Sequence, residues 1–382
     1  MIDQKKFYEC LQHAGVEFIT GVPDSRLNEF CLYAEAVLPQ GHHVIAANEG
    51  NAVALAAGYH LATGGVPLVY MQNSGLGNAM NPLLSLTNKD VYAIPVILLI
   101  GWRGEPGSSD WAQHKKQGEL TPTLLKIMEI PFRIMANDGD DAYDSARWAV
   151  NTAQEISGPT ALLAKKGVFE KDKKKEFNSE GCKYKMNREN AIECILKYVP
   201  KNTIFVATTG RATRELYKLR ILSGAGHEMD FLNVGAMGHA SSIAAGIALA
   251  EKKRLVVCLD GDAAAIMHLG ALTTTGVLGL TNFLHVVLNN GAHESVGGQP
   301  TAGFKANLTA IAEKAGYKTV GAAVETEQTL RNTIKNLLKT KGPSFIDIRI
   351  RKGISGDLPP LKISHIDLKN TFMQKIKDIT HA

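Results

Sequence analysis

The chain has few cysteines and few aromatic residues, and it has no long apolar run. No segment is apolar over the roughly 20 residues that a membrane helix needs, and the first residues contain no apolar signal-peptide core. The cysteines form no CxxC pair and are odd in number, which argues against a disulfide framework and favours reduced thiols in a cytoplasmic protein. They are Cys10, Cys31, Cys182, Cys194 and Cys258.

The net positive charge is small, and the basic residues are spread along the chain. The net charge of the 382 residues is +5, and Lys and Arg form no long basic stripe, so neither nucleic acid nor a membrane is an expected partner. What is present is an ordinary globular composition, with 45% hydrophobic and 21% charged residues. At this length we expect two domains.

Short apolar segments alternate with helix-like stretches in two blocks of the chain, which predicts an α/β fold with two doubly wound parallel-sheet domains. Strands are predicted at 17–20, 43–46, 67–71, 95–100 and 160–163, and then at 203–207, 230–233, 254–259, 283–288 and 344–350. Helices are predicted at 25–37, 49–63, 142–156, 187–198, 211–220, 239–250 and 325–338. A lysine-rich stretch separates the blocks, so we predict domains at 1–165 and 186–382 with a charged linker at 166–185.

Two predicted strands of the second block end in oxygen-bearing side chains beside a glycine, in the segments CLDGDAA and LNNGA. Asp262 and Asn290 are 28 positions apart (290 minus 262), which leaves room for one crossover helix. Because ligands bind beyond the carboxyl ends of parallel strands, the two side chains are expected to converge. With a loop carbonyl they form an oxygen-only set suited to Mg²⁺, and the N–H groups of Ala263 and Ala264 would face a diphosphate. Either motif alone is equally typical of a helix cap or a turn.

Together the two motifs resemble the GDG…NN signature of thiamine diphosphate-dependent enzymes. The resemblance implies that Mg²⁺ is bound by Asp262, Asn290 and the carbonyl of Ala292. Ala263 stands where the family usually has a third glycine, and the spacer between the motifs is about one residue longer than is common. Neither departure removes a side-chain ligand.

The same resemblance assigns the other cofactor contacts. In AANEGNAVALAAGYHLATGG, Glu49 would be the carboxylate that activates the aminopyrimidine ring, although a first-turn glutamate also stabilises a helix dipole. In NVGAMGHASS, Met237 would be the wedge under the bent cofactor and Gly235 would accept a hydrogen bond from its amino group. The segment ATTGRATRELY resembles a loop that binds the diphosphate or a cofactor ring, through Thr209, Gly210 and Arg211.

The family resemblance also predicts the domain roles and the assembly. The first domain would bind the pyrimidine ring, and the second would bind the diphosphate and Mg²⁺. Larger members have an additional middle domain, for which this chain has no room. In such enzymes the glutamate and the metal site come from different subunits, so we expect a homodimer or a larger homo-oligomer with shared active sites.

Motifs spread from Gly21 to Thr301 resemble, more specifically, members that decarboxylate phosphonopyruvate to phosphonoacetaldehyde and CO₂ in phosphonate biosynthesis. They include GVPDSRLNEF, YMQNSGLGNAMNPLLSL, GWRGEPG, QHKKQG and NNGAHESVGGQPT. Sulfopyruvate decarboxylation is the nearest alternative. Both substrates carry two acidic groups, which require positive charge and N–H donors.

The candidate substrate residues follow strands of the first domain. Arg103 and His114 are the first choices, with Lys115 and Lys116 less favoured; pairing of Arg103 with Glu105 is the alternative. Asp24 or Ser25 would bind the substrate carboxylate or protonate the carbanion, unless they only cap a helix. Asn73 and Ser74 are assigned to cofactor and substrate contacts, and His293 to proton transfer. This chain has Trp111-Ala112 before the glutamine and His114, where the family motif is more acidic and contains proline.

Two other classes of protein are alternatives to a decarboxylase. SGLGNAM is similar to a dinucleotide-binding fingerprint, but Met80 stands where a third small residue belongs, and no acidic residue follows at the expected distance. A non-catalytic thiamine-binding subunit is the other alternative. It is disfavoured because Glu49, Asp262 and Asn290 are all present.

Overall fold

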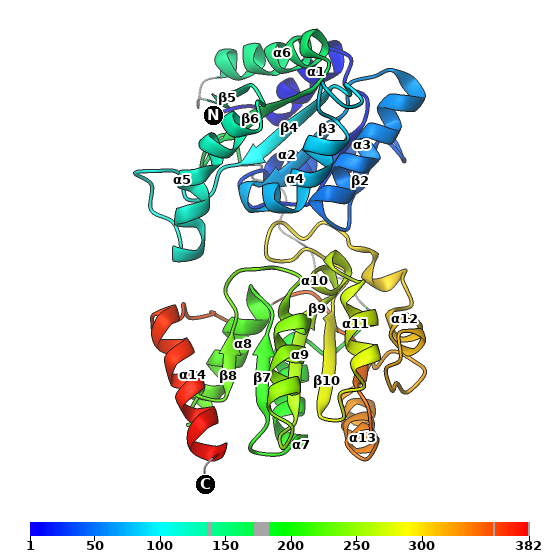
Figure 1. Cartoon of the computed structure of the whole chain (residues 1–382), viewed down its shortest axis with the longest axis vertical. Coiled ribbons are helices and arrows are strands. Elements are labelled where there is room, and N and C mark those ends of the chain that lie inside the picture. Colours follow the sequence, from blue (N-terminus) through cyan, green and yellow to red (C-terminus); the bar gives the residue numbers. More distant parts are fainter. Residues whose placement is uncertain (136–138, 172–182, 354–355, 381–382) are drawn as a thin grey trace. The chain divides into compact units, whose positions relative to one another are not determined.

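The computed structural model describes residues 1–135, 139–171, 183–353 and 356–380 (Figure 1). The chain divides into two compact units, which are described separately. Unit 1 comprises Met1–Glu176 with Ser295–Gln299, and unit 2 comprises Phe177–Glu294 with Pro300–Ala382. Each unit contains one sheet in which all paired strands are parallel, so the predicted pair of doubly wound α/β domains is confirmed.

The sheet of unit 1 has the strand order β2-β1-β3-β4-β6-β5. Its strands are β1 (Ile19–Gly21), β2 (His43–Ile45), β3 (Leu68–Gln72), β4 (Val96–Gly101), β5 (Phe132–Met135) and β6 (Pro159–Ala164). The helices are α1 (Gln4–His13), α2 (Asn28–Val37), α3 (Glu49–Thr63), α4 (Leu76–Ser85), α5 (Ala112–Ile127) and α6 (Gly139–Ile156), with a 3-10 turn η1 (Asn73–Gly75). The order reverses between β1 and β3, and active sites of open parallel sheets form at such positions.

The sheet of unit 2 has the order β11-β10-β9-β7-β8. Its strands are β7 (Ile204–Ala207), β8 (Asp230–Leu232), β9 (Val256–Gly261), β10 (Phe283–Asn289) and β11 (Ser344–Arg349). The helices are α7 (Arg188–Tyr198), α8 (Arg211–Leu222), α9 (Ala240–Ala250), α10 (Asp262–Met267), α11 (Ala271–Leu278), α12 (Leu308–Lys314), α13 (Glu327–Leu337) and α14 (His365–Thr380), with η2 (Ala302–Phe304).

Helices cover both faces of each sheet, which is why the central strands are apolar at every position rather than at every second one. Every residue of β4 is buried, and its alternate side chains belong to two separate cores. One core of unit 1 contains residues of α1, α2 and α6, and the other contains residues of α3, α4 and α5. In unit 2, α7, α8 and α13 pack on one face, and α9, α11, α12 and α14 pack on the other.

The strand that the sequence did not predict is β5. It lies at the edge of its sheet, and two of its four residues, Arg133 and Ile134, are exposed. An edge strand of this kind has no continuous apolar signal, which explains why the sequence pattern missed it.

The N-terminal end of the predicted linker packs on unit 1. Val168 and Phe169 are buried in its core, and Phe169 pairs with Ile2 in an isolated parallel bridge. Residues 172–182 of the linker, including Cys182, are outside the described residues, so the domain boundaries stay a prediction. Within the described part of the chain, Cys10, Cys31, Cys194 and Cys258 are free thiols, and none of the helices combines the length and hydropathy of a membrane span.

Candidate active-site residues in the two units

Asp262 and Asn290 lie together at the carboxyl edge of the sheet in unit 2. Strands β9 and β10 are neighbours, and Gly261 pairs in register with Leu288. Asp262 begins α10 directly after β9, and Asn290 follows the last residue of β10. The backbone N–H of Asn290 is 3.4 Å from Oδ1 of Asp262. Strand pairing therefore brings the backbone of Asn290 to the Asp262 carboxylate, and the convergence of the two side chains stays a prediction.

Asp262 is a buried carboxylate with few donors. It is 1% exposed, and its described donors are the Asn290 N–H, the hydroxyl of Thr301 and its own backbone N–H. Burial raises the pKa of Asp262 to about 6, although these hydrogen bonds act in the opposite direction. Gly303 lies so close that a Cβ there would overlap with the carboxylate. A buried anion with vacant acceptor capacity, in a space that a side chain would fill, fits a cation.

The two adjacent asparagines have different roles. The side chain of Asn289 is fully buried and donates to the Gly303 carbonyl (2.8 Å) and to Oδ1 of Asp347 (3.0 Å), so it joins β10 to its surroundings. The side chain of Asn290 instead donates to Oε2 of Glu294 (2.8 Å), and its oxygen accepts from the Ala292 N–H (3.0 Å). The side-chain oxygen of Asn289 accepts from the Gly291 N–H (3.2 Å), so the oxygens of both asparagines bind the loop after β10, and the NH₂ groups have different partners.

Glu294 is the centre of an ion-pair network that sequence reasoning missed. Oε1 of Glu294 is 2.8 Å from Nη1 of Arg211, and Nη2 of Arg211 donates to the Glu294 carbonyl at 3.1 Å. Arg188 binds the same carboxylate and also contacts Oε1 of Glu215 at 3.3 Å. Arg211 thus contacts the loop after Asn290 directly, which the sequence did not indicate.

The remaining cofactor candidates of unit 2 lie on loops at the same edge. Thr209 and Gly210 connect β7 to α8, and Gly210 has φ +103°, which favours glycine. In the loop before α9, the Gly235 N–H donates to Oδ1 of Asn233 at 3.2 Å. Met237 is half-buried in this loop. The structure places these residues as expected but does not test the roles given to them.

Helix α10 and the loop before α9 meet through two histidines. The rings of His239 and His268 are 4.4 Å apart, and a Cβ at Gly238 would approach His268 to 2.6 Å. Ala264 in α10 is buried, whereas Ala263 is half-buried at the exposed side of the helix start. This close packing holds the C-terminal end of α10 against the loop of Gly235 and Met237.

In unit 1, Glu49 begins α3 and is 5% exposed. Its Oε2 accepts a hydrogen bond from the side-chain amide of Asn78 at 2.8 Å. A Cβ on Gly75 would lie 2.5 Å from Oε1 of Glu49, so the glycine of η1 makes space for the carboxylate. Helix α3 is capped by Asn48, not by Glu49. Glu49 is therefore a buried, oriented acceptor rather than a solvated first-turn residue.

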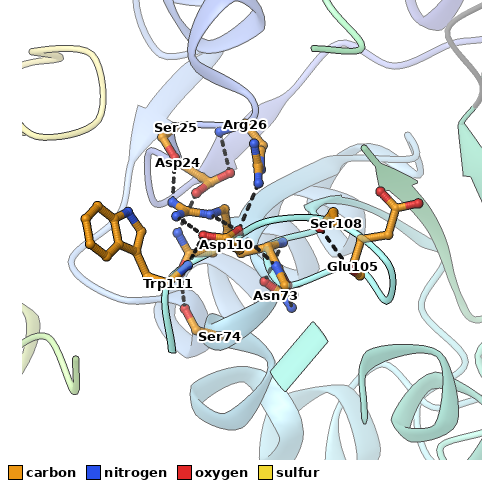
Figure 2. Close-up of polar contacts among 12 residues, drawn as sticks. Asp24, Ser25, Arg26, Asn73, Ser74, Glu105, Ser108, Asp110 and Trp111 are labelled. Carbon is orange, nitrogen blue, oxygen red and sulfur yellow. Dashed lines mark hydrogen bonds and ion pairs between the residues drawn. The ribbon is translucent and has the colours of Figure 1, made fainter. Parts of the chain in front are cut away.

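A second group of charged residues lies where β1, β3 and β4 end (Figure 2). Asp24 is fully buried and accepts from Nε2 of Gln72 (2.6 Å) and from the Arg26 N–H (2.8 Å). Burial raises the pKa of Asp24, and the two hydrogen bonds only partly offset this effect. Ser25 is exposed at the edge of the group.

Asp110 lies at the centre of this group in Figure 2 and holds Arg103 in a bidentate ion pair. Nε of Arg103 is 2.8 Å from Oδ2 and Nη2 is 2.6 Å from Oδ1 of Asp110, while Nη1 donates to the Ser25 hydroxyl at 3.0 Å. Arg26 and the N–H groups of Gly104 and Trp111 also donate to Asp110. Burial opposes the ionisation of Asp110, but these donors outweigh it and hold its pKa well below the usual range.

The alternative partner for Arg103 is wrong: Glu105 contacts Nζ of Lys165 at 2.8 Å instead. Asn73 fixes the backbone of Arg103, because it donates to the Arg103 carbonyl (2.9 Å) and accepts from its N–H (3.1 Å). Ser74 donates to the side chain of Gln72 at 2.8 Å. Asn73 and Ser74 therefore belong to the structure around Arg103, and a direct contact with substrate or cofactor stays a prediction.

The histidine and lysine candidates differ in exposure. His114 is half-buried near the start of α5, and burial together with the charge of Arg103 lowers its pKa to about 4. Burial likewise lowers the pKa of His293 to about 4. Lys115 and Lys116 are exposed, and Lys116 pairs with Glu119. Both histidines are thus neutral at pH 7, and the lysines lie on the solvated side of α5.

Comparison with known protein families assigns both units to one class of enzyme. The N-terminal TPP binding domain of thiamine pyrophosphate enzymes matches residues 4–125, and the C-terminal TPP binding domain of these enzymes matches residues 208–348. The matched ranges contain Glu49 in unit 1 and Asp262 and Asn290 in unit 2.

Relatives that match over almost the whole chain indicate which thiamine pyrophosphate enzymes this chain is most similar to. The chain is 32% identical to phosphonopyruvate decarboxylase of Streptomyces viridochromogenes, over 97% of this chain and 94% of that protein. It is 31% identical to phosphonopyruvate decarboxylase of Streptomyces hygroscopicus, over 98% and 94%. Sulfopyruvate decarboxylase of Methanosarcina acetivorans is 26% identical over 92% of each chain. The chain belongs to the phosphonopyruvate decarboxylase family of thiamine pyrophosphate enzymes.

Proposed function

We propose that the protein decarboxylates 3-phosphonopyruvate to phosphonoacetaldehyde and CO₂ in phosphonate biosynthesis, with thiamine diphosphate and Mg²⁺ as cofactors. The family membership supports a carboxy-lyase. The proposal depends on one observation. Three side chains that such an enzyme needs are buried and hydrogen-bonded at the carboxyl ends of the strands: Glu49 in unit 1, and Asp262 and Asn290 in unit 2. A protein that had lost catalysis would have no reason to keep these costly buried carboxylates.

Asp262, the side-chain oxygen of Asn290 and the carbonyl of Ala292 would hold Mg²⁺. All three groups would coordinate the metal through oxygen, and the Asn290 N–H is already in contact with the Asp262 carboxylate. Three protein ligands leave positions for diphosphate oxygens and water, which Mg²⁺ retains readily. The diphosphate would be bound by the loop before α8 and by the starts of α8 and α10, through Thr209, Gly210, Arg211, Ala263 and Ala264.

Thiamine diphosphate, when bound, supplies a nucleophilic carbon and an electron sink for the bond that releases CO₂. The role of Glu49 is to hold a proton on the aminopyrimidine ring. It suits this role because its carboxylate is buried, accepts from Asn78, and is directed into the space beside Gly75. Met237 and Gly235 would position the same ring system from the loop before α9.

Arg103 would bind an acidic group of the substrate. Its guanidinium is held flat by Asp110 and directs Nη1 toward the exposed Ser25 hydroxyl, where a phosphonate or carboxylate oxygen replaces or joins the serine. His114 is neutral at pH 7 and would act as a hydrogen-bond donor rather than as a second cation. Asp24, whose pKa is raised, would supply a proton to the product carbanion. His293 is the other candidate for proton transfer.

The assembly is proposed to be a homodimer or a larger homo-oligomer, in which Glu49 of one chain and the Mg²⁺ site of another complete each active site. The cytoplasm remains the predicted compartment because of the free thiols. Sulfopyruvate decarboxylation is the second candidate function, since a full-length relative with that activity is 26% identical.

The experiment is a parallel assay of CO₂ release from phosphonopyruvate, sulfopyruvate and pyruvate, with and without thiamine diphosphate and Mg²⁺. Cofactor-dependent turnover with the highest kcat/KM for phosphonopyruvate is the expected result. A higher kcat/KM for sulfopyruvate would keep the reaction and contradict the substrate assignment. Tight cofactor binding without turnover of any 2-oxo acid would show a non-catalytic subunit.

A further inference from the structure

We propose that Glu294 is a positioning residue of the metal site, which orients the side-chain oxygen of Asn290 toward the cation. The inference rests on the proposed Mg²⁺ site and extends it to a residue outside the ligand set. An asparagine can coordinate a metal only through its oxygen, and a rotation of 180° about its last bond would present the NH₂ group instead. Something must therefore select one orientation.

Glu294 makes that selection. An ionised carboxylate only accepts hydrogen bonds, so the atom of Asn290 that lies 2.8 Å from Oε2 of Glu294 is its NH₂ group. The Asn290 oxygen consequently lies on the other side, where it accepts from the Ala292 N–H at 3.0 Å and keeps a second lone pair. The rotated orientation would place the oxygen against the carboxylate and the NH₂ group against an N–H, which loses both hydrogen bonds.

The carboxylate of Glu294 is itself fixed. Arg188 from the start of α7 and Arg211 from the start of α8 bind it from two elements, and the Gly353 N–H donates to Oε1. The Glu294 side chain is only 11% exposed. The guanidinium groups of Arg188 and Arg211 both donate to this carboxylate, so they hold its oxygens in place as acceptors. The network has the form of a ligand, its orienting partner and the groups that hold this partner in place.

The test is the affinity for Mn²⁺ in the presence of thiamine diphosphate, measured by electron paramagnetic resonance of free Mn²⁺, so that no turnover is needed. Glu294→Ala is expected to raise the Kd for Mn²⁺ by about tenfold or more, the usual effect of losing an orienting partner. Glu294→Gln keeps one acceptor oxygen and is expected to lose only about threefold. Glu251→Ala is the matched control, because Glu251 is another buried glutamate of unit 2, paired with Arg254 near the opposite edge of the sheet. It should leave the Kd unchanged.

The decisive comparison uses Asn290→Asp, which presents oxygen in either orientation and needs no orienting partner. In this background, Glu294→Ala should change the Kd by less than about threefold. An equal loss in both backgrounds, or no loss in the wild-type background, would overturn the inference. If Glu294→Ala does not fold, Glu294→Gln is compared instead: its about threefold loss in the wild-type background should be absent in Asn290→Asp, and an equal loss in both would overturn the inference. Failure of the wild-type protein to bind Mn²⁺ would instead overturn the metal site itself.

Discussion

Two buried aspartates at the carboxyl edges of the two sheets have opposite electrostatic surroundings. Asp110 in unit 1 receives hydrogen bonds from the side chains of Arg103 and Arg26 and from two backbone N–H groups, and its pKa is well below the usual range. Asp262 in unit 2 receives two backbone N–H groups and one hydroxyl but no cationic side chain, and its pKa is raised to about 6. Asp262 is also more deeply buried than Asp110, so the charge of the donors and the depth of burial together make the difference.

We propose that the difference separates a structural carboxylate, Asp110, from a metal ligand, Asp262. The negative charge of Asp110 is balanced by the arginines Arg103 and Arg26 of the protein itself. This pairing holds Arg103 in place, so Asp110 stabilises the site before any substrate binds. Asp262 is buried without a cationic partner among its described contacts, and a divalent cation would supply what the protein does not. In the proposed function, unit 1 would provide positive charge for an acidic substrate, and unit 2 would provide negative charge for a metal.

The largest effect is expected from Glu49→Gln, which tests whether a third buried carboxylate acts chemically. The substitution keeps the size and the contact with Asn78 but removes the ability to hold a proton on the cofactor. We expect kcat to fall by about 10³-fold with an unchanged thermal midpoint, measured by CO₂ release and circular dichroism. Wild-type turnover in Glu49→Gln would remove Glu49 from the mechanism.

Asp110→Asn tests the unit 1 side of the comparison. Removing the charge leaves Arg103 and Arg26 buried without their anion, which is expected to cost about 3 kcal/mol of unfolding free energy. Because Arg103 is then free to move, KM for the substrate should rise about tenfold. Urea unfolding and steady-state kinetics measure the two effects.

The matched control is Asp144→Asn, because Asp144 forms an exposed ion pair with Arg147 in the same unit. Exposed pairs contribute little, so neither the unfolding free energy nor KM should change measurably. Equal effects of Asp110→Asn and Asp144→Asn would mean that the Asp110 network has no special role.

The predictions made from the sequence agree best with the structure for residues that come directly after a predicted strand. Asp262 and Asn290 were predictable because β9 and β10 are long apolar strands joined by one crossover, and parallel pairing then brings their ends together. Glu49 was assigned from its resemblance to the family, and the structure shows it buried at the start of α3.

The partners of these residues were not predictable, because loops bring them from distant parts of the chain. Glu294 and Arg188 are 106 positions apart, and Thr301 and Asp262 are 39 apart. Asp110 lies in an irregular loop, and nothing in SSDWAQH indicates that it binds Arg103 rather than solvent. The available signal was chemical: an arginine buried beside a binding site requires an anion, and Asp110 is only seven positions from Arg103.

The smallest effect is expected from Glu215→Gln, which tests how unit 2 tolerates a carboxylate that is not a ligand. Burial raises the pKa of Glu215 to about 7, and the neighbouring charge of Glu294 adds to this despite Arg188. The folded state therefore holds this proton more tightly than the unfolded chain, whose pKa is about 4.3. The stabilising contribution is complete below the unfolded value and is lost as the pH rises toward 7.

Glu215→Gln should remove this pH dependence. Relative to the wild type, the thermal midpoint of the variant is expected to improve as the pH rises from about 5 to 8, measured by differential scanning fluorimetry. A constant difference between variant and wild type across this range would show that Glu215 does not titrate there.

The most direct test of the account is the stabilisation of the protein by Mg²⁺ and thiamine diphosphate, compared between wild type and Asp262→Asn. A ligand that binds only the folded state raises the thermal midpoint in proportion to its affinity. The account predicts a clear Mg²⁺-dependent rise for the wild type and none for Asp262→Asn, which keeps the shape of the side chain but not its charge. An equal rise in both proteins would contradict the assignment of Asp262 as the metal ligand.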